Sequence, residues 1–155
     1  MESKIITIIE TILKKSGFHV EEIFLEQGET AGQRIFQIKT KEPKHLIGIR
    51  GDTLHAIDYL VKRIAEKAGI EEMFLVDVDG YRSKQIKDIQ QKALILAERA
   101  RSFQYDVELT PMSSYERLIV HSTLQNAPNI KTESRGEGKD RRIVIKYTPS
   151  QERVS

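Results

Sequence analysis

Cysteine is absent from this chain, which excludes disulfide bonds and metal sites built on thiolates. Its four histidines, at positions 19, 45, 55 and 121, show no metal-ligand spacing with one another. The glycine-rich phosphate loop of nucleotide-hydrolysing enzymes and the nucleophile motif of hydrolases are also missing, and the acidic residues are scattered. We therefore expect no metal and no cofactor, and we expect that the protein is not an enzyme.

Long hydrophobic runs are missing as well, and no apolar stretch reaches the roughly 20 residues that a membrane-spanning helix needs. The isoleucines at positions 5, 6, 8 and 9 resemble a signal-peptide core, but Glu10 interrupts them and no small-residue cleavage site follows. A hydrophobic fraction of 39% beside 31% charged residues is typical of a folded, soluble chain. Together with the lack of cysteine, this composition predicts a cytoplasmic protein without a transmembrane segment.

Charge is distributed unevenly, although the net charge of +2 is small. Residues 1–80 contain 11 basic and 14 acidic residues, whereas residues 81–155 contain 14 basic and 9 acidic ones. A basic second half favours an acidic partner such as nucleic acid. An ordinary solvated surface explains an excess of this size equally well.

Hydrophobic periodicity in the first half predicts one compact α+β unit. The expected elements are, in order, a helix over 3–15, strands over 18–25 and 34–40, a short helical turn over 44–47, a long helix that follows the Asp52 cap and ends near Gly69, and a strand over 73–78. Ser3 and Asp52 are the candidate caps of the two longer helices, and residues 27–32 are the expected hairpin loop.

The second half begins with the longest helical pattern, over residues 82–103, with an apolar face that runs from Ile86 to Phe103. The other expected elements are a brief strand at 107–109, a helix that stops before Pro128, and strands over 130–134 and 141–147. Ser113 and Glu116 have the spacing of a capping box at the start of the second helix.

A pair of glycines stands at the start of the long helix in the first half, in the sequence Gly48-Ile49-Arg50-Gly51. Glycines allow a sugar-phosphate backbone to approach the main chain, and free amides at a helix start attract anions. Arg50 can pair with a phosphate, and Lys44 lies just upstream. The alternative interpretation is a tight turn between two helices.

The segment HLIGIRGDTLHAIDYLVKRIAEKAG resembles the loop and second helix of a KH domain, an RNA-binding module whose GXXG loop clamps four backbone nucleotides. The order of elements is similar to the prokaryotic type II arrangement, αββααβ. This resemblance implies a KH domain over residues 1–80 in which Gly48, Ile49, Arg50 and Gly51 bind the RNA backbone.

Arg117 and His121 are four positions apart, so they lie side by side on the helix that follows Ser113. A guanidinium and an imidazole placed in this way can hold one phosphate. The alternative is structural: Arg117 pairs with Glu116 or another neighbour, and His121 is a packed core residue. No metal cluster or second base supports a phosphodiesterase.

The segment PMSSYERLIVHSTL, followed by IKTESRGEGKDRRIVIKY, resembles an R-three-H domain, named for an arginine and a histidine with three residues between them. Such domains bind single-stranded nucleic acid, which implies that Arg117 and His121 contact the backbone. The domain would span residues 81–155 and include a linking helix over 81–104. The two modules in this order are similar to the Jag family (SpoIIIJ-associated proteins) from residue 1 to about 148, without the Jag N-terminal domain that many members have.

Basic residues also gather on the last predicted hairpin, where some of them would share a face with Arg117 and extend an electrostatic track for a single strand. They are Lys131, Arg135, Lys139, Arg141 and Arg142. A solvated hairpin tip explains them about as well. Aromatic residues make up only 6% of the chain, and Tyr115 and Tyr147 are the candidates for base stacking.

Two hypotheses follow from the sequence. In the first, the chain binds single-stranded RNA, with single-stranded DNA as an alternative ligand, and acts in post-transcriptional regulation. In the second, it is an interaction or scaffold module that pairs through its KH domain, because the family resemblance implies another small KH-domain protein as partner.

Overall fold

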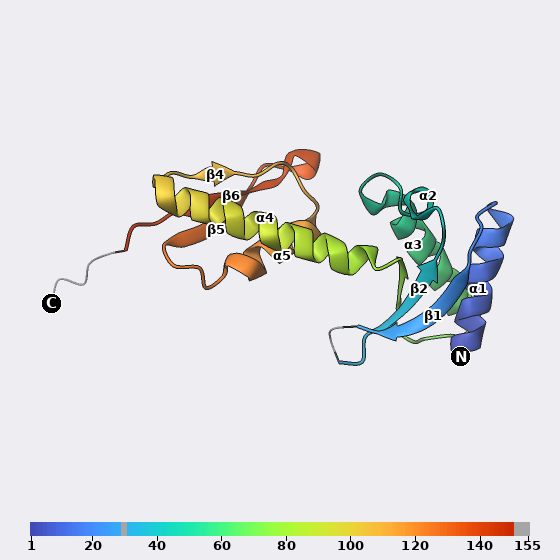
Figure 1. The fold of residues 1–155 in the computed structure, drawn as a ribbon. Coiled ribbons are helices and arrows are strands. Elements are labelled where there is room, and N and C mark those ends of the chain that lie inside the picture. Colours follow the sequence, from blue (N-terminus) through green and yellow to red (C-terminus); the bar gives the residue numbers. More distant parts are fainter. Residues whose placement is uncertain (29–30, 151–155) are drawn as a thin grey trace. The chain divides into compact units, whose positions relative to one another are not determined.

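The computed structural model describes residues 1–28 and 31–150 (Figure 1). It confirms a mixed α+β fold, and the chain divides into two compact units, Met1–Arg82 and Ser83–Ser155. The hairpin loop predicted over 27–32 contains residues 29–30, and the predicted second domain ends with residues 151–155; both segments lie outside the described residues. No helix in the described part of the chain is long and apolar enough to cross a bilayer.

The first unit has the element order that the sequence predicts. Its elements are α1 (Glu2–Lys15), β1 (Glu22–Gln27), β2 (Arg34–Lys39), α2 (Pro43–Ile47), the 3-10 helix η1 (Ile49–Gly51), α3 (Asp52–Lys67) and β3 (Leu75–Val78). The sheet order is β1-β2-β3, in which β1 pairs antiparallel with β2 and β2 pairs parallel with β3. The parallel pairing is allowed because the helical connection between β2 and β3 is long enough to bring the chain back to the starting end of the sheet.

One face of this sheet is buried in the core of the first unit. Alternation along the strands places Phe36, Ile38, Val76 and Val78 on that face, and all four are fully buried. The same cluster contains the buried residues of the helices, namely Ile5, Ile9, Leu13, Leu54, Ile57, Val61 and Ala65. Each large apolar side chain withdrawn from water contributes roughly 1.5–3 kcal/mol, so α1 and α3 are held firmly against the sheet.

Both predicted helix caps in the first unit are wrong. Ser3 lies inside α1, which begins at Glu2 and has Met1 as its N-cap. Asp52 is the first residue of α3, whose N-cap is Gly51, and no side chain accepts a capping hydrogen bond there. Because Gly51 adopts a φ of 80°, the chain turns into the helix one residue earlier than the sequence suggests. Asp52 still places a negative charge at the positive end of the helix dipole.

The second unit is built on an antiparallel sheet with the order β4-β6-β5. Its elements are α4 (Tyr81–Phe103), β4 (Val107–Glu108), α5 (Ser114–Leu124), β5 (Ile130–Arg135), the 3-10 helix η2 (Gly138–Asp140) and β6 (Arg142–Tyr147). The helix α4 begins two residues before the boundary between the units and runs into the second one. The core cluster of this unit consists of Ala93, Ala97, Ala100, Leu109, Val120, Leu124, Ile130, Ile143 and Ile145.

The predicted capping box of α5 is confirmed. The Ser113 hydroxyl accepts the backbone N–H of Glu116 at 3.2 Å, and the Glu116 carboxylate accepts the backbone N–H of Ser113 at 2.8 Å. The predicted apolar face of α4 is wrong at its end, because Phe103 is 70% exposed. Phe103 lies in the last turn, and its ring lies 6.0 Å from that of Tyr105 instead of in the core.

Candidate nucleic-acid interface

The glycine loop (residues 48–51) connects α2 to α3 and presents its two middle side chains to solvent. Gly48, Arg50 and Gly51 have φ values of 73°, 54° and 80°, which lie in the left-handed region. The side chain of Ile49 is 82% exposed, and Arg50 is also exposed. In the described part of the chain, no residue forms a hydrogen bond or ion pair with the Arg50 side chain, so its guanidinium is free to bind an anion.

The two glycines of the loop are required for steric reasons as well as for their backbone angles. A Cβ atom on Gly48 would lie 2.2 Å from the Thr53 hydroxyl and 2.9 Å from the backbone nitrogen of Thr53. A Cβ atom on Gly51 would lie 3.0 Å from the ring of Tyr81. The loop therefore packs directly against the first turn of α3 and the start of α4, which fixes its shape.

Basic side chains and the start of a helix adjoin this loop. Lys44 lies on α2, where its side chain is exposed and its carbonyl accepts the N–H of Gly48 at 3.0 Å. The first turn of α3 lacks a side-chain cap, so the positive end of its dipole faces the loop. Lys44 and Arg50 therefore belong to one short segment in which both side chains are exposed.

Arg117 lies in the first half of α5 and is half-buried. Its Nη1 donates to the carbonyl of Met112 at 2.8 Å, and its Nη2 donates to the Ser114 hydroxyl at 3.1 Å. The guanidinium does not pair with Glu116, whose carboxylate belongs to the capping box and also accepts from Gln85. Arg117 thus ties the segment before α5 to the helix, and its charge is not neutralised by a carboxylate in the described residues.

His121 lies one turn farther along α5 and is partly buried. Its Nδ1 lies 2.7 Å from the hydroxyl of Thr132 on β5. Burial lowers the pKa of His121 below its usual value of 6.5, and the charge of Arg117 lowers this pKa further. The neutral imidazole is therefore the main form near pH 7. This side chain links α5 to the edge strand of the sheet instead of lying in the core cluster.

A hollow of about 340 Å³ adjoins His121 at the edge of the second unit. Polar and basic residues make up most of its border, together with Leu124 and Ile130; they are His121, Ser122, Gln125, Lys131 and Thr132. Lys131 is exposed and forms no ion pair within the described residues. Of the predicted basic residues on the hairpin, Lys131 is the one that shares this hollow with His121.

The other basic residues of the hairpin are largely engaged by neighbours. Arg135 forms an ion pair with Glu133, and Arg142 forms one with Glu108. Arg135 and Arg142 lie opposite each other in the register of β5 and β6. Because side chains alternate along a strand, Arg135 and Lys131 both project from the face of the sheet opposite to that of Thr132, but only Lys131 of these two borders the hollow beside His121. The structure does not bring these two arginines to His121.

The tip of the hairpin contains Lys139 and Arg141. Lys139 lies in η2 and is exposed. Nη1 of Arg141 donates to the carbonyl of Gly136 at 2.9 Å, which stabilises the turn. These two residues contribute charge at the tip. The carbonyl of Arg141 also accepts the N–H of Met112 at 3.1 Å, so Arg141 adjoins the segment that holds Arg117.

Thr132 is the site residue that sequence reasoning missed. Its position on β5, between the exposed Lys131 and Glu133, places it on the face that contacts the helices. This alternation is visible in the sequence, but the identity of its partner is not, because His121 lies 11 residues away on another element.

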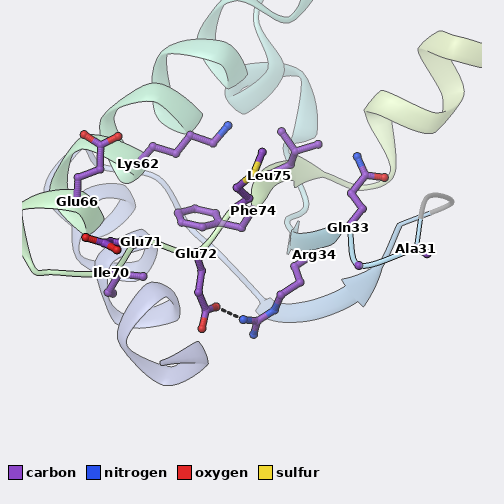
Figure 2. Close-up of a pocket in the computed structure, with 12 residues that line it drawn as sticks. Ala31, Gln33, Arg34, Lys62, Glu66, Ile70, Glu71, Glu72, Phe74 and Leu75 are labelled. Carbon is purple, nitrogen blue, oxygen red and sulfur yellow. Dashed lines mark hydrogen bonds and ion pairs between the residues drawn. The ribbon is translucent and has the colours of Figure 1, made fainter.

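A wider hollow, of about 810 Å³, lies near the last turns of α3, whereas the glycine loop lies at the start of that helix (Figure 2). Figure 2 shows the carboxylate of Glu72 facing the guanidinium of Arg34, with which it forms an ion pair. Glu66 and Glu71 also line this hollow. The carboxylates make it a poor place for a phosphate.

Comparison with known proteins identifies the second unit by family. Residues 87–147 match the family model of the R-three-H domain, the same domain that this segment of the sequence resembles. The matched range contains most of α4 and the whole of the β4-β6-β5 sheet, together with Arg117, His121 and Thr132.

Relatives with curated names match nearly the whole chain. The "RNA-binding protein KhpB" of Bacillus subtilis (strain 168) is 35% identical over 144 residues, which is 91% of this chain and 66% of the relative. The protein of the same name from Clostridium symbiosum is 30% identical over 146 residues, which is 94% of this chain and 65% of the relative. The chain thus spans slightly less than two thirds of the length of these relatives.

Proposed function

This chain belongs to the Jag family, whose relatives carry the name RNA-binding protein KhpB, and on that premise we propose that it binds single-stranded RNA without catalysing a reaction. Binding takes place at two sites, the glycine loop of the first unit and the Arg117–His121 pair of the R-three-H domain. Single-stranded DNA competes for the same sites, because both grip phosphates. The biological outcome that we propose is post-transcriptional regulation in the cytoplasm.

The observation that carries this proposal is the exposed, uncompensated charge of the glycine loop. Ile49 and Arg50 are presented to solvent on a backbone that two glycines hold in the left-handed region. A phosphate can reach the main chain there, and an exposed isoleucine offers an apolar surface to a sugar or base.

We also assign the first unit as a type II KH domain. The order αββααβ, the short helix α2 before the loop, and the parallel pairing of β2 with β3 support the assignment. On this assignment, Gly48, Ile49, Arg50 and Gly51 clamp the RNA backbone, and Lys44 adds charge.

In the R-three-H domain, Arg117 and His121 provide positive charge and a hydrogen-bond donor on one face of α5. Two guanidinium nitrogens of Arg117 already bond to Met112 and Ser114, so the charge acts mainly through space. His121 and Lys131 border the adjoining hollow, which makes them the direct contacts for phosphate.

The glycine loop is tested by replacing its exposed residues and keeping both glycines. The variant Ile49→Asp with Arg50→Asp should weaken binding of a fluorescein-labelled single-stranded RNA at least tenfold, because two carboxylates then repel the phosphates. Fluorescence anisotropy gives the dissociation constant, and thermal unfolding shows whether the fold is intact.

A matched control changes one basic and one apolar residue away from the loop. Lys4→Asp with Met73→Asp alters the net charge by the same amount, and both side chains are exposed. This control should bind within twofold of the wild type once the small general effect of charge is included. Equal affinities for the loop variant and the wild type would refute the proposed role of the loop.

A second function, pairing with another KH-domain protein, is favoured by an apolar stripe on α3. Tyr59, Leu60 and Ile64 are 63%, 46% and 38% exposed, on one side of a helix whose opposite side is buried. Light scattering on the purified protein tests pairing of the chain with itself, and Leu60→Asp should abolish any dimer. A dimer that ignores added RNA would favour this second function over the first.

A further inference from the structure

The hydroxyl of Thr132 has a single hydrogen-bond partner in the described residues, the Nδ1 atom of His121 at 2.7 Å. A threonine hydroxyl has one proton, which it can give to one acceptor. The distance between the two atoms fits a bond in either direction, because a hydroxyl can donate to Nδ1 or accept from it. When the hydroxyl donates, Nδ1 is the unprotonated nitrogen of the ring, and in the neutral imidazole Nε2 carries the hydrogen.

Nε2 has no hydrogen-bond partner among the described residues. His121 also borders the hollow of about 340 Å³, along with Ser122, Gln125 and Lys131. Arg117 from α5 acts on the ring, because its charge lowers the pKa of His121, and Lys131 from β5 borders the same hollow. With its hydrogen on Nε2, the ring presents a donor without a partner near these cations, an arrangement that fits an anion.

We propose that Thr132 is a positioning residue that holds Nδ1 of His121 and directs its Nε2–H into this hollow, where it donates to one phosphate oxygen of single-stranded RNA. This inference rests on the proposed function and adds to it a specific subsite with Lys131 as its cation. Because the neutral ring already provides a donor, the contact forms without uptake of a proton.

A purely structural role for Thr132 makes a different prediction. If Thr132 served only to pack β5 against α5, its replacement would weaken RNA binding even in the absence of the imidazole. If Thr132 acts through its bond to His121, its replacement can have no effect once the imidazole is gone, and a double-mutant cycle tests this point. A bond that only joined α5 to β5 would form with either tautomer, whereas the positioning role requires the ring proton on Nε2.

The cycle uses the full chain and a fluorescein-labelled single-stranded RNA of mixed sequence, at pH 8. Thr132→Val should weaken binding about fivefold, which corresponds to the loss of one hydrogen bond of about 1 kcal/mol. Thr132→Ser should restore the wild-type affinity. Ser134→Ala is the matched control, because Ser134 follows on the same face of β5 and its buried hydroxyl has no partner in the described chain. His121→Ala should bind at least as weakly as Thr132→Val, and the double variant should equal His121→Ala.

A spectroscopic measurement examines the tautomer without RNA. Long-range proton–nitrogen correlation spectra of ¹⁵N-labelled protein at pH 8 should show the ring proton of His121 on Nε2. Three outcomes would overturn the positioning role even if His121→Ala binds RNA weakly. They are a ring proton on Nδ1, wild-type affinity of Thr132→Val, and losses of affinity that add in the double variant. Wild-type affinity of both His121→Ala and Arg117→Ala would instead refute the proposed RNA site itself, and the inference with it.

Discussion

The side chain of His121 forms a hydrogen bond between two elements, and its pKa is shifted. Its Nδ1 is engaged by Thr132, and burial together with Arg117 lowers its pKa. A histidine whose pKa is lower in the folded chain than in the unfolded chain contributes to the free energy of unfolding. The contribution is complete at a pH above the unfolded pKa of about 6.5, and it is lost as the pH falls from the unfolded pKa to the folded one.

We expect Arg117→Gln to raise the pKa of His121 toward 6.5 without reaching it, because burial is the larger cause and remains. A pH titration of the imidazole signals by NMR measures both values. Arg99→Gln removes an equal charge from an exposed position on α4 and should leave the pKa of His121 unchanged. A pKa of His121 in the wild type above that of an unfolded peptide would contradict the lowered value.

At the scale of elements, the junction between α2 and α3 depends on Gly48. We expect Gly48→Ala to destabilise the protein by about 2 kcal/mol or more, because left-handed backbone costs any residue other than glycine about 1–2 kcal/mol and the new methyl group also clashes with Thr53. Gly69→Ala has the same kind of backbone angle, with φ of 79°, but no atom within 4 Å of the new Cβ. The difference between the two variants in urea unfolding isolates the clash, and equal stabilities would disprove it.

The start of α5 depends on its capping box. Ser113→Ala should lower the free energy of unfolding by about 1 kcal/mol, since the amide of Glu116 loses its acceptor. Ser122→Ala is the control, because Ser122 is an exposed residue of the same helix without a side-chain hydrogen bond in the described chain. Urea unfolding followed by circular dichroism compares them, and an equal loss from both substitutions would show that the box contributes nothing.

The elements could be predicted from the sequence where a local pattern defines them. The Ser113–Glu116 spacing predicts the capping box, and the hydrophobic periodicity predicts the order αββααβ. The prediction failed at two helix ends: Gly51 takes the N-cap position of α3 in place of Asp52, and Phe103, the last residue of α4, is exposed. The exposed glycine loop was also visible in the sequence. The partners of Arg117 and His121 were not, because they depend on how the segment before α5 and strand β5 pack against that helix.

At the scale of the whole molecule, the distribution of charge predicts how the two units share an RNA. The first 80 residues contain more acidic than basic residues, whereas the rest contain 14 basic and 9 acidic ones. Long-range attraction therefore comes mainly from the second unit, and the glycine loop relies on local charge and on its backbone. Because both units belong to one chain, an RNA bound by one is present at high effective concentration near the other.

This linkage predicts that the effect of inactivating one unit depends on the length of the RNA. Ile49→Asp with Arg50→Asp should weaken binding of a 30-nucleotide RNA by a larger factor than binding of an 8-nucleotide RNA, because only the longer strand can occupy both units at once. The salt dependence should change in parallel: the slope of log affinity against log salt falls by about 0.7 for each phosphate contact that is lost. Anisotropy titrations at several salt concentrations provide both quantities. The loss of affinity could instead be the same for both RNA lengths, with an unaltered salt slope for the longer RNA. The two units would then bind RNA independently, and their linkage would not increase the affinity.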